Sequence, residues 1–177
     1  GRYATYNTMR GNYKKAKQGI THRRQVLFVR NQYWLLVDDL SSPNASVFER
    51  LFQCAPEVSV LQLASGVQLN KQGTNQRLIV MPAERSEVTY AQGELNPIAG
   101  WACDGNRNTR YPAPQLSIKS TAAKSARLVT LLMPTADQEK EPSIETLARG
   151  TEGDLLRVTY YQDNQQITDE ISLRPAS

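Results

Sequence analysis

Short runs of apolar and β-branched residues recur along most of the chain, separated by residues that favour turns. The clearest runs cover residues 26–29 and 33–37, and the polar pair Asn31-Gln32 between them predicts a short turn. The two runs therefore predict a β-hairpin. Similar runs predict further strands near residues 47–54, 58–63, 67–69, 77–81, 87–90, 116–118, 127–133, 155–161 and 167–173.

Proline, glycine and asparagine mark the connections between the predicted strands. Residues 41–44 and 93–99 predict loops, residues 71–75 a turn, and residues 162–165 a hairpin loop. The only candidate helix is a short, weak one at residues 143–149. Strands spaced about eight to twelve residues apart favour an all-β fold, which we expect to be a two-sheet antiparallel β-sandwich with little or no helix.

The alternation of side chains indicates how some strands are covered. Residues 167–173 are mostly apolar on one face and polar on the other, which is typical of a half-exposed strand. Residues 25–29 and 128–133 are apolar on both faces, so we expect both faces of these strands to be covered. The cover is either the interior of the domain or a partner domain.

Composition bounds the class of protein. The 177 residues are 40% hydrophobic and 21% charged, as in ordinary globular proteins, and we expect residues 1–177 to form a single domain. No run approaches the ~20 apolar residues that a membrane span needs. The chain begins at Gly1 rather than at a methionine, so we expect it to be part of a longer protein.

Positive charge is concentrated at the start of the chain. Residues 1–37 contain eight Lys and Arg residues and no Asp or Glu, whereas the remainder carries more acidic than basic residues. Such a segment attracts polyanions, and Tyr3, Tyr6 and Tyr13 lie between the charges, where they would suit stacking on sugars or nucleobases. The alternative is a solvated basic edge without a dedicated ligand.

Residues for self-sufficient catalysis are scarce. His22 is the only histidine, and the chain has no G-x-S-x-G turn, phosphate-binding loop or CxxC pair. The adjacent pair Asp38-Asp39 must point to opposite faces of a strand, which does not suit a glycosidase pair. Cys54 and Cys103 are either free thiols, which we favour, or a disulfide. With one histidine, no CxxC pair and no phosphate-binding loop, we expect neither a cofactor nor a metal site.

Two blocks of sequence resemble one known family. The first is His22-Arg23-Arg24 at the start of a strand, followed by a Tyr33-Trp34 strand that ends in Val37-Asp38. The second contains Gly100-Trp101, a polar loop, the segment Tyr-Pro-Ala-Pro at 111–114 and the strand at 128–134. Their order is similar to that in the C-terminal β-domain of heparinase II/III-like polysaccharide lyases. The resemblance reaches from about residue 3 to residue 134.

The resemblance implies a parent enzyme that cleaves an acidic, uronate-containing polysaccharide, such as a glycosaminoglycan or alginate, by β-elimination. In that family most acid–base groups lie on an N-terminal (α/α) toroid, which is absent from this sequence. We therefore expect this segment to be inactive alone. Its expected role is to support the toroid and the substrate cleft. The implied partners are the acidic polysaccharide and the toroid, without a membrane span or nucleic acid, and the implied location is periplasmic or secreted.

The resemblance and the residue types together suggest a set of substrate-binding candidates. His22 is also the one candidate for a role in proton transfer. Because His22 and Arg24 share one strand face, Arg23 must take the other. Each candidate residue could instead have a purely structural role, such as a domain contact or core packing. The chain as a whole could instead be a stand-alone carbohydrate-binding module or a structural domain with a basic docking surface. The candidates are His22, Arg23, Arg24, Trp101, Arg110 and Tyr111.

Overall fold

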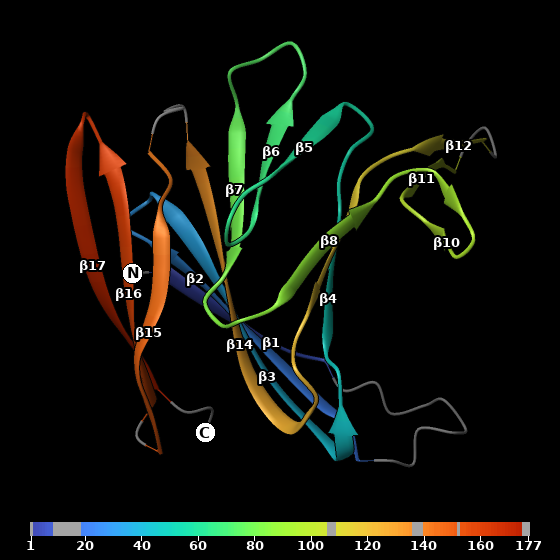
Figure 1. Cartoon of the computed structure of the whole chain (residues 1–177). Coiled ribbons are helices and arrows are strands. Elements are labelled where there is room, and N and C mark those ends of the chain that lie inside the picture. Colours follow the sequence, from blue (N-terminus) through green and yellow to red (C-terminus); the bar gives the residue numbers. More distant parts are fainter. Residues whose placement is uncertain (1, 9–18, 106–108, 136–139, 152, 175–177) are drawn as a thin grey trace.

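The computed structural model describes residues 2–8, 19–105, 109–135, 140–151 and 153–174. Within these ranges the chain consists of antiparallel strands and contains no helix (Figure 1). The prediction of an all-β, antiparallel fold is confirmed.

One long sheet, which we call the central sheet, forms the middle of the molecule. Its seven strands are all antiparallel, and strands far apart in sequence are neighbours in it. The connections between these neighbouring strands therefore leave the central sheet and return to it, and they contain the strands of the other sheets. The strand order is β1 (Arg2–Thr8), β2 (Thr21–Val29), β3 (Tyr33–Ser46), β14 (Ala123–Thr135), β7 (Arg77–Pro82), β6 (Val67–Lys71) and β5 (Val58–Gln62).

Two three-stranded sheets pack against opposite faces of the central sheet. On one face, Tyr33, Leu35 and Leu131 of the central sheet join Leu156 and Val158 of the C-terminal sheet in the first core. On the other face, a second core is formed with the small sheet (Figure 1). The C-terminal sheet is β15 (Ser143–Gly150), β16 (Gly153–Gln162) and β17 (Gln165–Leu173), and the small sheet is β4 (Glu49–Gln53), β13 (Gln115–Lys119) and β8 (Glu87–Ala91).

Strand β14 is covered on both faces, as its sequence predicted. Val129, Leu131 and Met133 belong to the first core, whereas Leu132 packs against the second. The strand is apolar on both sides because it lies between two cores, so no partner domain is needed to explain it. Strand β2 is only half-buried along most of its length.

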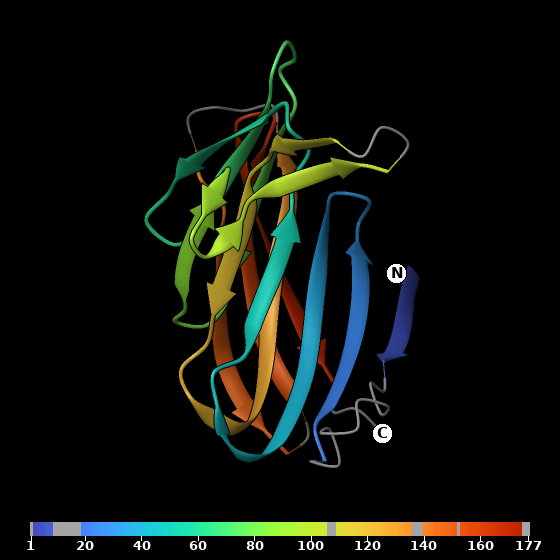
Figure 2. The same cartoon turned by 90° about the vertical axis from the view of Figure 1, so that its right-hand side faces the viewer.

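A short arm projects from the small sheet at the end of β8 (Figures 1 and 2). Gly100, with a φ of 73°, makes the turn between its two hairpins. A Cβ at Gly100 would lie 2.4 Å from the carbonyl oxygen of Ala91, so only glycine fits this close approach of two backbones. The strands of the arm are β9 (Glu94–Leu95), β10 (Ile98–Ala99), β11 (Trp101–Asp104) and β12 (Thr109–Pro112).

The structure corrects three local predictions. Residues 143–149 are not helical, because Ile144 joins the first core and the segment pairs with β16 through a bulge between Thr146 and Ala148. Residues 41–44 are not a loop, because β3 continues through them to Ser46, paired with β2 as far as Ser41 and with β14 across an irregularity between Ala123 and Ser125. The turn of the first hairpin is centred on Arg30-Asn31, one residue earlier than predicted, and both residues have positive φ.

Some shorter elements were missing from the prediction. Strand β1 pairs with β2 from His22 to Phe28, and the loop predicted at 93–99 contains the two short strands β9 and β10. The hairpin loop at 162–165 is confirmed, with positive φ at Asp163 and Asn164. Positive φ at two successive residues is what a tight hairpin turn requires.

A buried arginine connects the small sheet to the central sheet. Arg50 of β4 is 4% exposed, and its Nη1 donates to Thr130 Oγ1 at 2.7 Å and to the carbonyl oxygen of Val129 at 3.3 Å. Its Nη2 donates to a carboxylate oxygen of Glu84 and to Ser86 Oγ. Glu84 also accepts from the backbone nitrogen of Val129, so one charged network bridges both sheets.

A buried tyrosine makes the matching connection to the C-terminal sheet. Tyr33 is fully buried, and its hydroxyl donates to Asp169 Oδ2 at 3.0 Å, while Arg30 Nε lies 3.1 Å from Asp169 Oδ1. Tyr33 also packs edge-to-face on Tyr160 with ring centroids 5.5 Å apart. Burial, the hydrogen bond to Asp169 and the charge of Asp169 all raise the pKa of Tyr33 far above its usual value.

We expect this raised pKa to appear in an alkaline titration of the folded chain. Tyr33 should stay protonated through the range near pH 10 in which a tyrosine ordinarily ionises, until the chain unfolds. Because the folded pKa exceeds the unfolded one, the contribution of Tyr33 to stability is complete below about pH 10 and is lost as the pH rises above it. Tyrosinate absorbance against pH, with Tyr33→Phe as the control, measures this. Simultaneous ionisation of all eight tyrosines in the folded state would contradict it.

Candidate functional site

The first candidate cluster joins His22, Arg24 and Asp38 across β2 and β3. Asp38 is fully buried, and its Oδ1 accepts from His22 Nε2 at 2.7 Å and from Arg24 Nε at 2.6 Å. Its Oδ2 accepts from Arg24 Nη2 at 2.9 Å. His22 and Arg24 therefore share one strand face, as the sequence predicted, and their side chains remain about one-third exposed.

This cluster offsets much of the positive charge seen in the sequence. Arg24 already holds one carboxylate with two nitrogens, and Arg30 lies against Asp169. Arg23 lies opposite Asp39 in the strand register, on the other face of the sheet. The arginines of β2 and the following turn thus lie next to acidic residues of β3 and β17. The lysines at positions 14, 15 and 17 and Tyr13 lie outside the described residues.

The Asp38-Asp39 pair points to opposite faces, as the alternation of strand side chains requires. Asp39 Oδ1 accepts from Arg127 Nε at 2.6 Å, on the side away from Asp38. This hydrogen bond raises the pKa of Arg127, which remains a cation. The two carboxylates accordingly serve two separate arginine contacts, and they do not form an acid–base pair.

A second candidate region is apolar surface on the central sheet that the small sheet leaves uncovered. Phe28 and Trp34 stack with ring centroids 4.7 Å apart, and both are half-buried. The register places Trp34 beside Leu132, on the face that carries the second core. From there the apolar surface continues along the ends of β14, β7, β6 and β5. We call it the open face, and its residues are Phe28, Trp34, Leu132, Pro134, Leu78, Leu69 and Val58.

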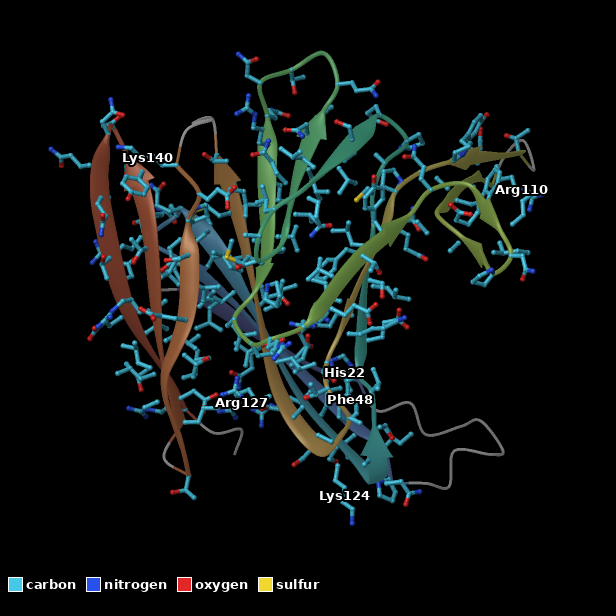
Figure 3. The ribbon with its side chains drawn as sticks, in the orientation of Figure 1. His22, Phe48, Arg110, Lys124, Arg127 and Lys140 are labelled. Carbon is cyan, nitrogen blue, oxygen red and sulfur yellow. The ribbon has the colours of Figure 1, made fainter. Side chains whose placement is uncertain are left out.

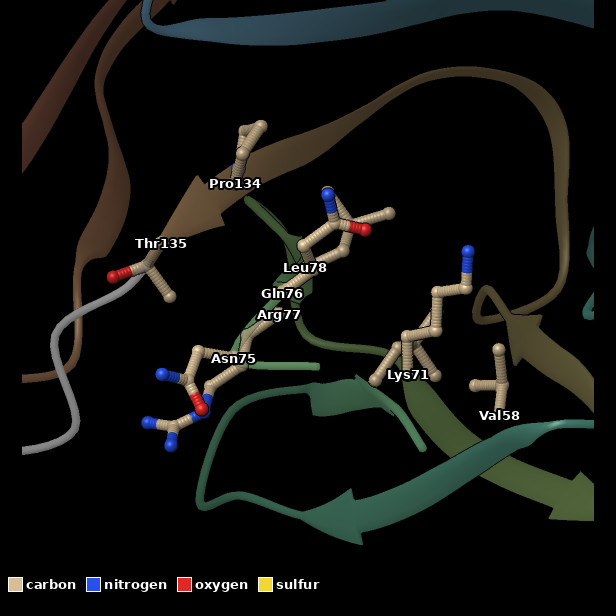
Figure 4. A pocket seen from close by; sticks show the side chains of 9 residues that line it. Val58, Lys71, Asn75, Gln76, Arg77, Leu78, Pro134 and Thr135 are labelled. Carbon is tan, nitrogen blue, oxygen red and sulfur yellow. The ribbon is translucent and has the colours of Figure 1, made fainter. Parts of the chain in front are cut away.

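The far end of the open face is hollowed into a cavity of about 720 Å³ (Figure 4). Val58, Leu69 and Leu78 supply apolar walls, and Lys71 and Arg77 supply positive charge at its margin. None of the residues that line this cavity is acidic. Its volume is in the range of small-molecule sites, and its cations suit an anionic group. Sequence patterns did not find it, because its walls come from three sheet strands and the end of a fourth.

The remaining candidates lie together on the projecting arm. Arg110 Cζ stacks over the ring of Trp101 at 4.8 Å, and Trp101 Nε1 donates to the carbonyl oxygen of Glu94 at 2.8 Å. Tyr111 is 43% exposed, and its hydroxyl accepts from Thr109 Oγ1. The arm is well separated from His22 (Figure 3). The six candidates therefore form no single site: the His22 cluster and the arm are apart, and Arg23 faces away from both His22 and Arg24.

Other chemistry is limited in the part of the chain that the structure describes. That part contains no group of three or more His, Cys, Asp and Glu residues placed to hold a metal ion. It also holds no helix long and apolar enough to cross a membrane. Both cysteines are free thiols, as expected, and burial raises the pKa of Cys54.

Comparisons with known proteins place this fold in a family. The sequence profile of the heparinase II/III-like C-terminal domain matches residues 4–147. The chain therefore belongs to the heparinase II/III-like family and corresponds to its C-terminal domain. A search of curated proteins found no significant match.

Solved structures with the same fold support this assignment. A crystal structure of heparinase III aligns with a TM-score of 0.67 at 14% identity, over 96% of this chain and 27% of that chain. The heparan sulfate lyase HepC from Pedobacter heparinus aligns with a TM-score of 0.65 at 15% identity, over 99% of this chain and 26% of that chain. The chain thus spans about a quarter of the length of these similar proteins, and at this identity the likeness concerns the fold.

Proposed function

We propose that this chain is the C-terminal β-domain of a polysaccharide lyase that cleaves an acidic, uronate-containing polysaccharide by β-elimination. The domain would support an N-terminal catalytic domain and form one side of its cleft. Family membership supports the class of enzyme, and the names of the similar structures point to heparan sulfate as one candidate polymer. An enzyme that degrades such extracellular polymers would act in the periplasm or after secretion.

The open face is the observation that supports a role for this domain in holding the catalytic domain. An apolar surface that includes a stacked Phe28–Trp34 pair and continues to a cavity is costly to leave in water. The similar proteins are almost four times as long as this chain, so ample polypeptide is available to cover it. The occupant that we propose is the N-terminal domain of the same protein.

The chemistry of β-elimination explains why this segment would need that domain. A base must remove the proton at C5 of the uronate, an acid must protonate the leaving oxygen, and the carboxylate must be neutralised. His22 is the only imidazole in the chain, and its Nε2 is held by Asp38. His22 and Arg24 would then act at one margin of the cleft, whereas Arg23 faces the other side of the sheet. Lys71 and Arg77, at the far end of the open face, would add charge for substrate carboxylates.

The arm favours a second candidate function, a carbohydrate-binding module without catalysis. Arg110 and Tyr111 are exposed there, and Trp101 presents an aromatic ring beneath Arg110. Such groups can bind sugars through stacking and hydrogen bonds. The two functions differ in what they require: a module should bind polysaccharide alone, whereas a supporting domain contributes only when it is joined to its catalytic domain.

We expect Trp34→Ala to weaken docking in the full-length protein that carries this domain, because a buried tryptophan at an interface is often worth about 2 kcal/mol or more. The full-length protein should form unsaturated uronate from a uronate polymer, the variant should form it more slowly, and the isolated chain should form none. Ultraviolet absorbance of the product measures all three.

The matched control is Leu51→Ala, since Leu51 is 57% exposed and lies outside the open face. Unfolding of the isolated chain with and without Trp34→Ala separates docking from folding. Equal losses of stability in the isolated and full-length forms would assign Trp34 to folding alone. Cleavage by the isolated chain, or by no form of the protein, would overturn the proposed function.

A further inference from the structure

Strand β5 lies at one end of the central sheet, and β6 is its only paired neighbour in the described part of the chain (Figure 1). Its residues, Val58–Gln62, pair with β6 in an unbroken register, so no bulge bends the strand away from a partner. An edge strand of this kind presents backbone N–H and C=O groups that a further strand can bind. We call this row of backbone groups the β5 edge.

The β5 edge lacks the side chains that usually protect such strands. Proteins often block an edge strand with charged residues or with proline, and Val58–Gln62 contains neither. Among the described edge strands longer than two residues, β5 is the only one without Lys, Arg, Asp or Glu. The other such strands, each with at least one charged residue, are β1, β4, β8, β11, β12, β15 and β17.

Hydrogen bonds at both ends of the β5–β6 pair show which backbone groups point outward. The backbone nitrogen of Gln72 donates to the carbonyl oxygen of Glu57, and that of Leu63 donates to Gly66, both at 3.0 Å. Bonded and non-bonded positions alternate along an antiparallel pair, so the odd-numbered residues of β5 bond to β6. The even-numbered residues therefore direct their backbone groups away from the sheet, and they are Val58, Val60 and Gln62.

The side chains of β5 leave room for a neighbouring strand. Val60 packs against the second core, so the alternation of side chains places Ser59 and Leu61 on the opposite face. Leu61 is 52% exposed, and Ser59 and Gln62 are exposed as well. A strand added at the β5 edge would cover part of Leu61, and removing this apolar surface from water is favourable.

We propose that the β5 edge pairs with the β5 edge of a second copy of this chain, antiparallel about a two-fold axis at Val60. The two Val60 residues then exchange both of their outward hydrogen bonds. The N–H of each Gln62 donates to the carbonyl oxygen of Val58 in the other copy. Leu61 of each copy lies across from Ser59 of the other, where the two side chains contact each other.

The symmetry of the strand favours a second copy as the occupant. With Val60 on the axis, every residue with outward backbone groups meets another such residue, so the ladder is complete along the strand. A two-fold pairing also brings side chains close to their own counterparts, which would repel one another if they were charged, and β5 has no charge.

This pairing extends the central sheet within its own plane through backbone groups, and it leaves the open face to the N-terminal domain. The inference therefore goes beyond the proposed lyase function and does not rest on it. A strand as short as β5 buries less than the ~1,200–2,000 Å² of a standard interface, so the association should be weak and reversible.

Sedimentation velocity of the isolated chain, from low micromolar to millimolar concentration, tests the pairing. We expect a reversible monomer–dimer equilibrium that Val60→Pro weakens at least about tenfold, because proline removes an outward N–H and no bond to β6. Leu61→Lys should weaken it by a similar factor, because it places two cations near the axis. Should Val60→Pro also lower the unfolding temperature, Leu61→Lys decides the outcome.

The matched control is Leu51→Lys, which makes the same change of charge at a residue that is 57% exposed on β4. This variant should form dimers as the original chain does. A chain that stays monomeric throughout, or a dimer that Leu61→Lys weakens no more than Leu51→Lys, would overturn the proposal. So would a full-length protein that stays monomeric while the isolated chain forms dimers, because the N-terminal domain would then occupy the β5 edge.

Discussion

Replacing Arg50 with alanine is expected to lower the free energy of unfolding by about 3–5 kcal/mol. Arg50 is buried between the small sheet and the central sheet, where it donates to Thr130 and Glu84. Its loss leaves the Glu84 carboxylate, 13% exposed, without its cation, and it also removes the link through Val129. Chemical denaturation of the isolated chain, followed by circular dichroism, measures the change.

A matched control is Arg157→Ala, because Arg157 forms exposed ion pairs with Glu145 and Glu170. Exposed pairs contribute about 0–1 kcal/mol, so this variant should unfold almost as the original chain does. The double variant Arg50→Met with Glu84→Leu should lose less than Arg50→Ala, because it leaves no unpaired buried charge. If Arg50→Ala cost no more than Arg157→Ala, the network would not hold the two sheets together.

Gly100→Ala should also be strongly destabilising, by about 3 kcal/mol. The carbonyl oxygen of Gly100 accepts from the backbone nitrogens of Gly93 and Ala113 at 2.8 and 2.9 Å, so the base of the arm depends on its position. An added Cβ would lie 2.4 Å from the oxygen of Ala91 and 2.5 Å from Gln92 Cα, and backbone atoms cannot yield as a flexible side chain would. Denaturation midpoints and Trp101 fluorescence report the loss.

Gly73→Ala isolates the contribution of backbone conformation. Gly73 has nearly the same φ, 72°, but a Cβ there would meet nothing within 4 Å. We therefore expect it to cost only the conformational strain, about 1–2 kcal/mol. Equal losses at the two positions would show that the base of the arm can shift to accept a side chain.

The sequence was most informative where the structure depends on local pattern. The strand at 128–133 was expected to be covered on both faces because its apolar residues show no alternation, and β14 is buried in this way. His22 and Arg24 were expected on one face because strand side chains alternate, and both bind Asp38. Family resemblance, carried by motifs within residues 3–134, was confirmed by the profile match.

Long-range pairing limited what could be predicted. Arg50 and Glu84 are 34 positions apart, and nothing in either local sequence shows that they meet. Residues 143–149 have helical patterning, but the edge of β16 and the first core impose a strand. Asp39 and Asp154 line one pocket although they lie on different sheets, so no spacing rule could reveal that they are neighbours.

The position of the central sheet between two cores bears on where the domain can be divided. The family match ends at residue 147, within β15, whereas β16 and β17 still supply Leu156, Val158 and Leu173 to the first core. A chain shortened at that point would strip one whole side of β14 and expose Leu131 to water. The sequence match to the family thus ends inside the first core, and the last thirty or so residues complete that core although the family profile does not cover them.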